Sequence, residues 1–354
     1  MNIIVDGKRY SNFVSAEVTA SMDAFARSFS FVAATKDGVN DMPFRPGQAC
    51  QILVDGEKIL TGFIERIEYM TDTMGNTYTI SGRDKMGDLL DSNLPGMSDA
   101  GPTVKATCEK VLKFLGIDAR VIDETGEGVK AFEEQFDVIA PDASETAFDF
   151  LVSVARRRQV MLTSNGDGDL VIVRGVGTPI DQSIVNRASG KDNNVEKVTF
   201  VVDHTRRFGS YVVEGQMNLT AIDGTADAGA IAGSSFKVRD PDGIRSSRVK
   251  SISSEGTFSP TYSRDLARWE CNVARARSRQ YVATMIGFRD RNGELWRQNT
   301  APVVIDDFAG INSRMLVFGT QYILDDRGQT TILSITDRDA FRVIEEPSSD
   351  DLIL

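Results

Sequence analysis

Short apolar and β-branched runs recur through the first 92 residues, and turn-forming pairs separate them. The runs share strand-like composition: Asn2–Val5, Ser28–Ala33, Ala49–Val54, Ile59–Tyr69 and Thr77–Ser81. Asp55-Gly56 lies directly between two of them, as in a two-residue hairpin. Many short strands at this spacing indicate a small barrel, so we predict a first β-barrel domain over residues 1–93.

Helical spacing replaces this pattern after residue 94. The first predicted helix, Thr103–Leu115, carries its apolar residues on one face, and Gly116 follows as a C-terminal stop. A second helix is predicted from an N-cap at Ser144 to the arginines at 156–158, whose charges complement the helix dipole. A hairpin follows, so we predict a compact α/β domain over residues 94–175.

Strand-like runs return in the rest of the chain, around a segment of different character. We predict a second β-barrel domain from residues 176–216 and 281–345, and a flexible tail over 346–354. Residues 217–280 are predicted to be an insertion, with a loop-rich part and an amphipathic helix over Ser263–Gln280. Four arginines share one side of that helix: Arg264, Arg268, Arg275 and Arg279. The predicted fold class is mainly β with α+β parts.

The two β regions resemble each other. Residues 44–84 contain a strand ending in Asp, a strand ending in Tyr, a Gly turn and a strand ending in Arg-Asp. Residues 295–339 contain the same series, with a two-residue insertion in the last segment. Self-similarity of this kind indicates duplication of one barrel within the chain. Two similar barrels per subunit would let a trimer present six quasi-equivalent units around an axis.

Composition narrows the class of protein. The 354 residues include 51 acids and 40 lysines and arginines, for a net charge of −11, and a general nucleic-acid binder would need a basic face. No apolar stretch approaches the roughly 18 residues of a transmembrane helix, and we expect no signal peptide. Three scattered cysteines and one histidine, His204, do not suit Cys/His zinc sites or Ser-His-Asp hydrolases. We therefore expect no metal, cofactor or enzymatic activity.

Several segments resemble the baseplate hub proteins of contractile-tailed phages of the Mu type, in the late control protein D family. They are Ile4–Gly7, Leu60–Glu68, Ser81–Asp91, Glu145–Ala155 and the arginine-lined helix that leads to Trp296. The resemblance implies a homotrimer whose barrels form a pseudo-sixfold ring between the hexameric tail tube and a separate trimeric spike. DNA would pass through this ring without specific binding. The resemblance also implies a virion protein of the tail baseplate, assembled in the host bacterial cytoplasm, without catalytic residues.

Two other functions stay open from the sequence: a tail-associated peptidoglycan hydrolase and a cytoplasmic β protein that binds carbohydrate or peptide. The arginine stripe also has two interpretations, a solvated helix face or a contact with an acidic surface. Residues 99–149 hold 12 acids and 5 bases, whereas residues 236–291 hold 12 bases and 6 acids. Because such segregation favours charge complementarity between parts of an assembly, we predict that Arg264, Arg268, Arg275 and Arg279 face another subunit or a partner.

Overall fold

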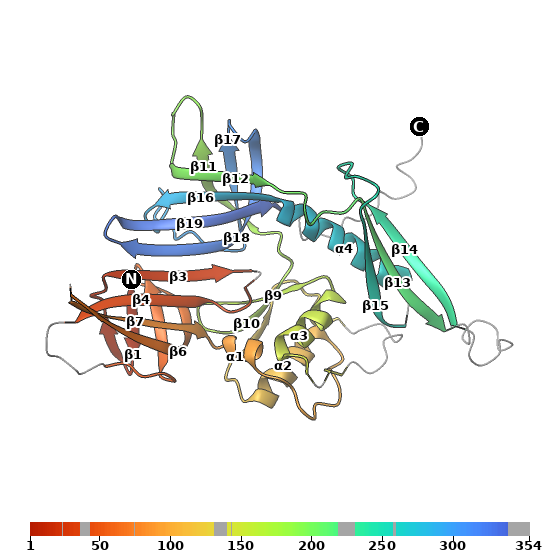
Figure 1. Cartoon of the computed structure of the whole chain (residues 1–354), viewed down its shortest axis with the longest axis horizontal. Helices are drawn as coiled ribbons and strands as arrows, with labels where there is room; N and C mark the ends of the chain where they lie inside the picture. Colours follow the sequence, from red (N-terminus) through yellow and green to blue (C-terminus); the bar gives the residue numbers. More distant parts are fainter. Residues whose placement is uncertain are drawn as a thin grey trace.

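The computed structural model describes residues 1–22, 24–35, 43–73, 75–130, 140–142, 144–218, 231–257 and 260–338. In that part of the chain, thirteen strands belong to one large sheet, and two three-stranded sheets and four helices complete the fold (Figure 1). The chain is therefore mainly β, as predicted.

The first β unit, residues 1–84, encloses one apolar core. Its strands are β1 (Asn2–Val5), β2 (Lys8–Tyr10), β3 (Ser15–Ser21), β4 (Ser28–Thr35), β5 (Ala49–Val54), β6 (Glu57–Asp72) and β7 (Gly75–Asp84). Asp55 has a φ of 48° and Gly56 a φ of 87°, the left-handed pair that closes a tight hairpin between β5 and β6. Ile3, Phe31 and Ile52 are fully buried in the core between these strands.

The α/β unit, residues 87–173, follows directly. Its elements are α1 (Gly87–Asp91), α2 (Val104–Leu115), β8 (Val121–Asp123), α3 (Ala147–Arg156), β9 (Met161–Ser164) and β10 (Leu170–Val173). Gly116 ends α2 with a φ of 70°, as predicted. The N-cap of α3 is Thr146 rather than the predicted Ser144, because the Thr146 hydroxyl accepts the Asp149 N–H at 3.1 Å.

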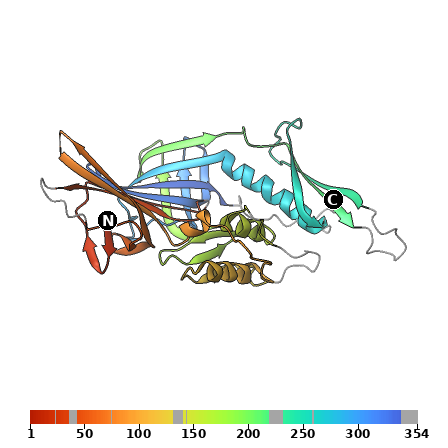
Figure 2. The same ribbon diagram turned by 60° about the horizontal axis from the view of Figure 1, so that its bottom comes forward.

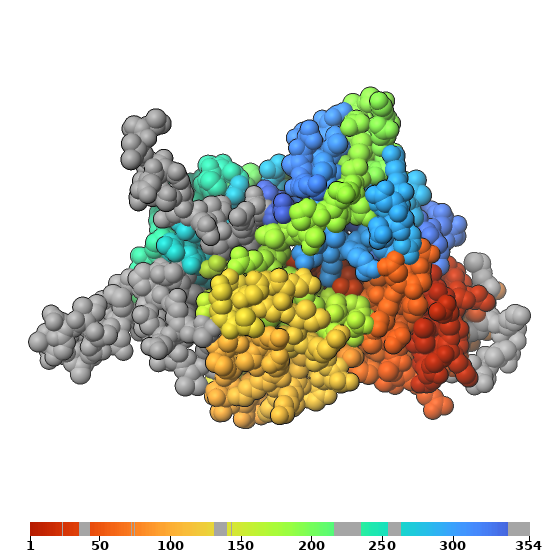
Figure 3. All heavy atoms as spheres, turned by 180° about the vertical axis from the view of Figure 1, so that it is seen from behind, coloured from red at the N-terminus to blue at the C-terminus, as the bar shows by residue number. Residues whose placement is uncertain are grey.

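The second β unit, residues 178–202 and 279–337, forms the other end of the large sheet. Its strands are β11 (Thr178–Asn186), β12 (Val195–Val202), β16 (Arg279–Ile286), β17 (Thr300–Asp306), β18 (Ile311–Asp325) and β19 (Gly328–Asp337). Tyr281 and Trp296 are buried in its core. Figure 3 shows this unit above the first β unit and the α/β unit, which lie side by side.

The two β units repeat one strand order. It is β12-β16-β19-β18 in the second unit and β3-β4-β7-β6 in the first, and β17 and β5 pair with β18 and β6. The hairpin of β6 and β7 has one bulged residue, Glu65, and the hairpin of β18 and β19 has one, Phe318. Each bulge lies seven residues before the end of the first strand of its hairpin. These features support the predicted repeat. No two-residue insertion is needed, because β7 and β19 both have ten residues and Asp337 aligns with Asp84.

The insertion between β12 and β16 contains a small sheet and a long helix. Its elements are β13 (Ser210–Asn218), β14 (Ile231–Arg239), β15 (Val249–Thr257) and α4 (Pro260–Ser278). Figure 2 shows α4 running from the large sheet to this small sheet. The composition predicted loops here, but Phe236, Val238 and Ile252 pack against α4 and so favour strands. Residues 219–230 of the loop-rich segment and the predicted tail at 346–354 lie outside the described residues.

Candidate interaction surfaces

The four arginines predicted to share one face do not all lie on α4. Arg264, Arg268 and Arg275 are half-buried on the helix, whereas Arg279 is exposed and begins β16, because α4 ends at Ser278. The Arg264 guanidinium contacts the Asp265 carboxylate at 3.0 Å. Arg275 contacts Asp242 at 3.3 Å. The structure therefore places part of the stripe in contacts within the chain.

A buried ion pair lies beside Arg275. Arg207 is 1% exposed and donates two hydrogen bonds of 2.7 Å to the Asp240 carboxylate, whose side chain is 0% exposed. It also contacts Asp242, and its hydrogen bond holds the pKa of that carboxyl below its usual range. This arrangement ties the segment before β13 to the segment after β14. Sequence reasoning missed it, because the partners are 33 residues apart and nothing marks them as buried.

A half-buried arginine, Arg27, joins the first β unit to the α/β unit. Arg27 donates to the Ile59 carbonyl at 2.7 Å and to the Ser164 carbonyl at 2.8 Å. Its backbone N–H donates to Asp84, which also accepts the Met86 N–H, each at 3.0 Å. Burial raises the pKa of Asp84 to about 6. Asp84, which ends the first copy of the repeat, therefore lies at the junction between the first β unit and the α/β unit.

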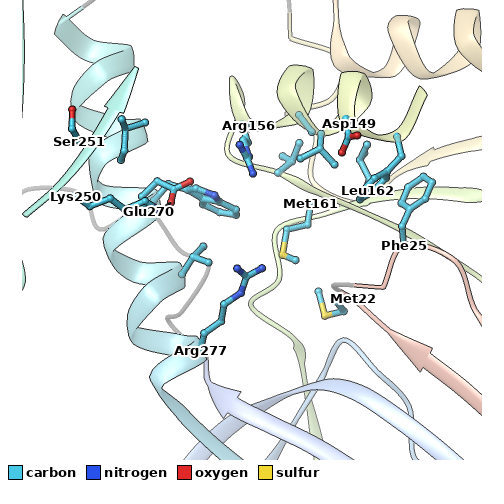
Figure 4. A pocket seen from close by; sticks show the side chains of 17 residues that line it. Met22, Phe25, Asp149, Arg156, Met161, Leu162, Lys250, Ser251, Glu270 and Arg277 are labelled. Atoms are coloured by element: carbon cyan, nitrogen blue, oxygen red, sulfur yellow. Dashed lines mark hydrogen bonds and ion pairs between the residues drawn. The ribbon is translucent and has the colours of Figure 1, made fainter. Parts of the chain in front are cut away.

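A cleft of about 590 Å³ separates the α/β unit from α4 and β15 (Figure 4). Arg156 of α3 and Arg277 of α4 lie on opposite sides of it, and Met22 and Met161 lie at its apolar end. Lys250 contacts Glu270 at 2.8 Å on the α4 side. Mixed charge beside apolar side chains is typical of a contact surface.

A third feature is the strand pair that joins the two β units. Residues Gly319–Leu324 of β18 pair antiparallel with Ala16–Ser21 of β3. Tyr322 is 1% exposed in the core of the first β unit, and its hydroxyl donates to the Trp296 carbonyl. The two β units therefore share one sheet and one packed junction.

The three cysteines do not form a reactive thiol site. Cys50, Cys108 and Cys271 are buried, and burial raises the pKa of all three thiols, to about 12 for Cys50 and about 11 for Cys271. Such thiols are poor nucleophiles. Across the described ranges, no three His, Cys, Asp or Glu side chains gather as a metal site. A membrane-spanning helix is also absent from them.

Comparison with protein families shows which proteins this chain resembles. Residues 1–84 match the N-terminal domain of Mu phage baseplate assembly protein GpP-like proteins, and residues 86–174 match the second domain of baseplate hub protein gp44-like proteins. Residues 259–344 match the fourth domain of Mu phage baseplate assembly protein GpP. The chain is also 27% identical to baseplate hub protein gp44 of Escherichia phage Mu, over 96% of this chain and 88% of that protein.

The chain belongs to the Mu-type baseplate hub proteins. The hub also resembles the 43 kDa tail protein of prophage MuSo2 from Shewanella oneidensis, with a TM-score of 0.80 and 25% identity over 96% of this chain and 98% of that one. A tail protein from Neisseria meningitidis MC58 has the same fold, with a TM-score of 0.80 and 21% identity over 96% and 97% of the chains. The hub is therefore a structural tail protein of the virion.

Proposed function

We propose that this hub assembles as a homotrimer whose six β units form a pseudo-sixfold ring. The ring would join the hexameric tail tube to a trimeric spike. The repeated strand order, with a bulge at the same place in both hairpins, carries the proposal. Two equivalent units in one chain present six similar surfaces in a trimer, as a sixfold neighbour requires, while the rest of the chain keeps threefold symmetry for a spike.

We propose further that DNA passes along the open face of the large sheet, meaning the side whose side chains point away from both cores. Along β3, β7 and β19 this face carries mostly small polar side chains, including Thr19, Thr79, Ser81 and Ser334. The basic side chain on the open face of β7, Arg83, contacts Glu65 at 2.8 Å. The one basic side chain of β3, β7 and β19 is therefore paired with an acid, which suits passage of DNA along these strands rather than binding, because phosphate contacts supply most of the affinity for DNA.

The domain boundaries follow from the same proposal. The tube-type units would be residues 1–93 and residues 176–216 with 281–345, and the α/β unit and the insertion would surround them. Arg264, Arg268, Arg275 and Arg279 would face a neighbouring subunit or a baseplate partner. No catalytic role is proposed, and the absence of cell-wall clearing in a zymogram would support a purely structural hub.

The mass of the purified chain in solution, alone and with a candidate spike protein, tests the proposal. We expect a trimer in at least one of these samples and a ring with threefold symmetry in negative-stain images. A monomer in both samples, together with any other stoichiometry in assembled tails, would refute it. Cell-wall clearing by the pure chain would instead favour a hydrolase.

A further inference from the structure

The strand edges of the large sheet that have no partner within the described part of the chain include one on β12 and one on β6. The strand β12 pairs with β16 on one side only. The outer half of β6, Arg66–Thr71, pairs with β7 on one side only. Unpaired edges of this length are templates for another strand.

Both edges expose large apolar side chains. On β6, Tyr69 is 54% exposed and Met70 is 57% exposed. On β12, Val201 is 44% exposed and Val202 is 55% exposed. Unlike scattered single residues, adjacent apolar side chains on an open strand edge indicate an interaction site.

The chain contains its own template for how these edges meet. By strand order and bulge position, β6 is equivalent to β18 and β12 is equivalent to β3. Within the chain, β18 and β3 pair, and Tyr322 lies opposite Val18. Tyr322 is 1% exposed and Val18 is 0% exposed. The residue equivalent to Tyr322 on β6 is Tyr69.

We propose that the outer half of β6 pairs antiparallel with β12 of the next copy of the chain. Carrying over the register of the β18–β3 junction places Tyr69 opposite Phe200 of the partner subunit and Met70 opposite Thr199 of the partner subunit. The interface is head to tail, so three copies close the large sheet into a ring. The inference rests on the proposed trimer and specifies which strands hold it together.

Chemical complementarity supports this register. Arg66 falls opposite Asp203 of the partner subunit, so unlike charges meet at one end of the pair. Tyr69 points to the same side of the sheet as the buried Tyr322, and there it would reach the half-buried Phe200 and Val198 at the edge of the second core. A shift by one residue would place Tyr69 opposite a side chain of the other face.

Cysteine cross-linking tests the register. In the Met70→Cys/Thr199→Cys variant, both new thiols lie on the open face and directly opposite each other between copies, within reach of a disulfide. Mild oxidation is expected to give a covalent trimer, with nothing larger, on a non-reducing gel. The matched control, Met70→Cys/Val198→Cys, presents its thiols on opposite faces and is expected to remain uncross-linked. The three native cysteines are buried.

A charge swap gives a second readout. Arg66→Glu is expected to weaken trimer formation about fivefold per interface, and adding Asp203→Lys is expected to restore it. Light scattering measures both variants, and the cysteine pair is also examined in assembled tail particles, where the hub occupies its final position. A trimer in which only the control pair cross-links would overturn the inference and leave the proposed ring standing. Particles without a trimer of the hub would overturn both.

Discussion

Replacing Arg207 with methionine tests whether the buried ion pair holds the insertion together. Arg207 is 1% exposed and donates two hydrogen bonds of 2.7 Å to Asp240, whose side chain is 0% exposed. The variant keeps a long side chain but leaves the Asp240 carboxylate buried without its cation. Breaking a buried pair on one side costs about 3–5 kcal/mol. We therefore expect the β13–β15 sheet to open roughly a thousandfold more often.

Hydrogen–deuterium exchange, followed by peptide, measures this opening. Protection should fall in β13, β15 and the end of α4, while β5, β6 and β7 keep theirs, because the pair lies only in the insertion. The double variant Arg207→Met/Asp240→Asn should recover most of the loss, since it removes both charges and keeps an acceptor for the Asp242 N–H at 2.9 Å.

Arg327→Met is the surface control. Arg327 is 83% exposed and contacts Asp325 at 2.9 Å, and an ion pair in that setting contributes little. If Arg207→Met changed protection in the insertion no more than Arg327→Met does, the buried pair would not stabilise this unit. Equal loss in the double and single variants would show that packing, rather than charge, explains the effect.

Three further predictions concern the junctions and the arginines. Burial raises the pKa of Asp84 to about 6, so its contribution to stability is present below the ordinary pKa and lost as pH rises through about 6. From pH 4 to pH 7.5, the difference in unfolding free energy between Asp84→Asn and wild type, measured with urea, should therefore shift by about 2 kcal/mol in favour of the variant; a flat difference would contradict this. Tyr281→Phe should cost about 2 kcal/mol in urea unfolding, because the buried Tyr281 hydroxyl donates to Asp306 at 2.7 Å; no change would exclude a stabilising bond. Arg264→Glu/Arg279→Glu, which spares the contact of Arg275 with Asp242, should reduce hub assembly or spike binding in light scattering, and normal assembly would show a solvated face.

Local signals in the sequence predicted the elements that depend on local chemistry. The Asp55-Gly56 turn, the stop of α2 at Gly116 and the hairpin of β9 and β10 all appear in the structure. Each depends on residues within a few positions of one another. The start of α3 was wrong by two residues, since Ser144 and Thr146 are both good caps and only the three-dimensional hydrogen bond distinguishes them.

The elements and contacts that depend on residues far apart in the sequence could not be predicted from it. The strands β14 and β15 have few apolar residues, and only their packing on α4 makes them strands. The charge pattern marked the arginines of α4 as an interface, but it could not show that Arg275 meets Asp242, which lies in a distant segment. The junction of β18 with β3 was equally invisible, because no sequence pattern states which edges pair.

The β18–β3 junction also sets an order of events during synthesis. The hydroxyl of Ser21, at the end of β3, donates to the Phe318 carbonyl 297 residues later in the chain. At a ribosomal rate of roughly 5–20 residues per second, the β3 edge waits about 15–60 s for its partner. A chain released early lacks β18 and still exposes β3. The inner edge of β3 is therefore covered only after Gly319–Leu324 have been synthesised, so the junction between the two β units forms late in synthesis.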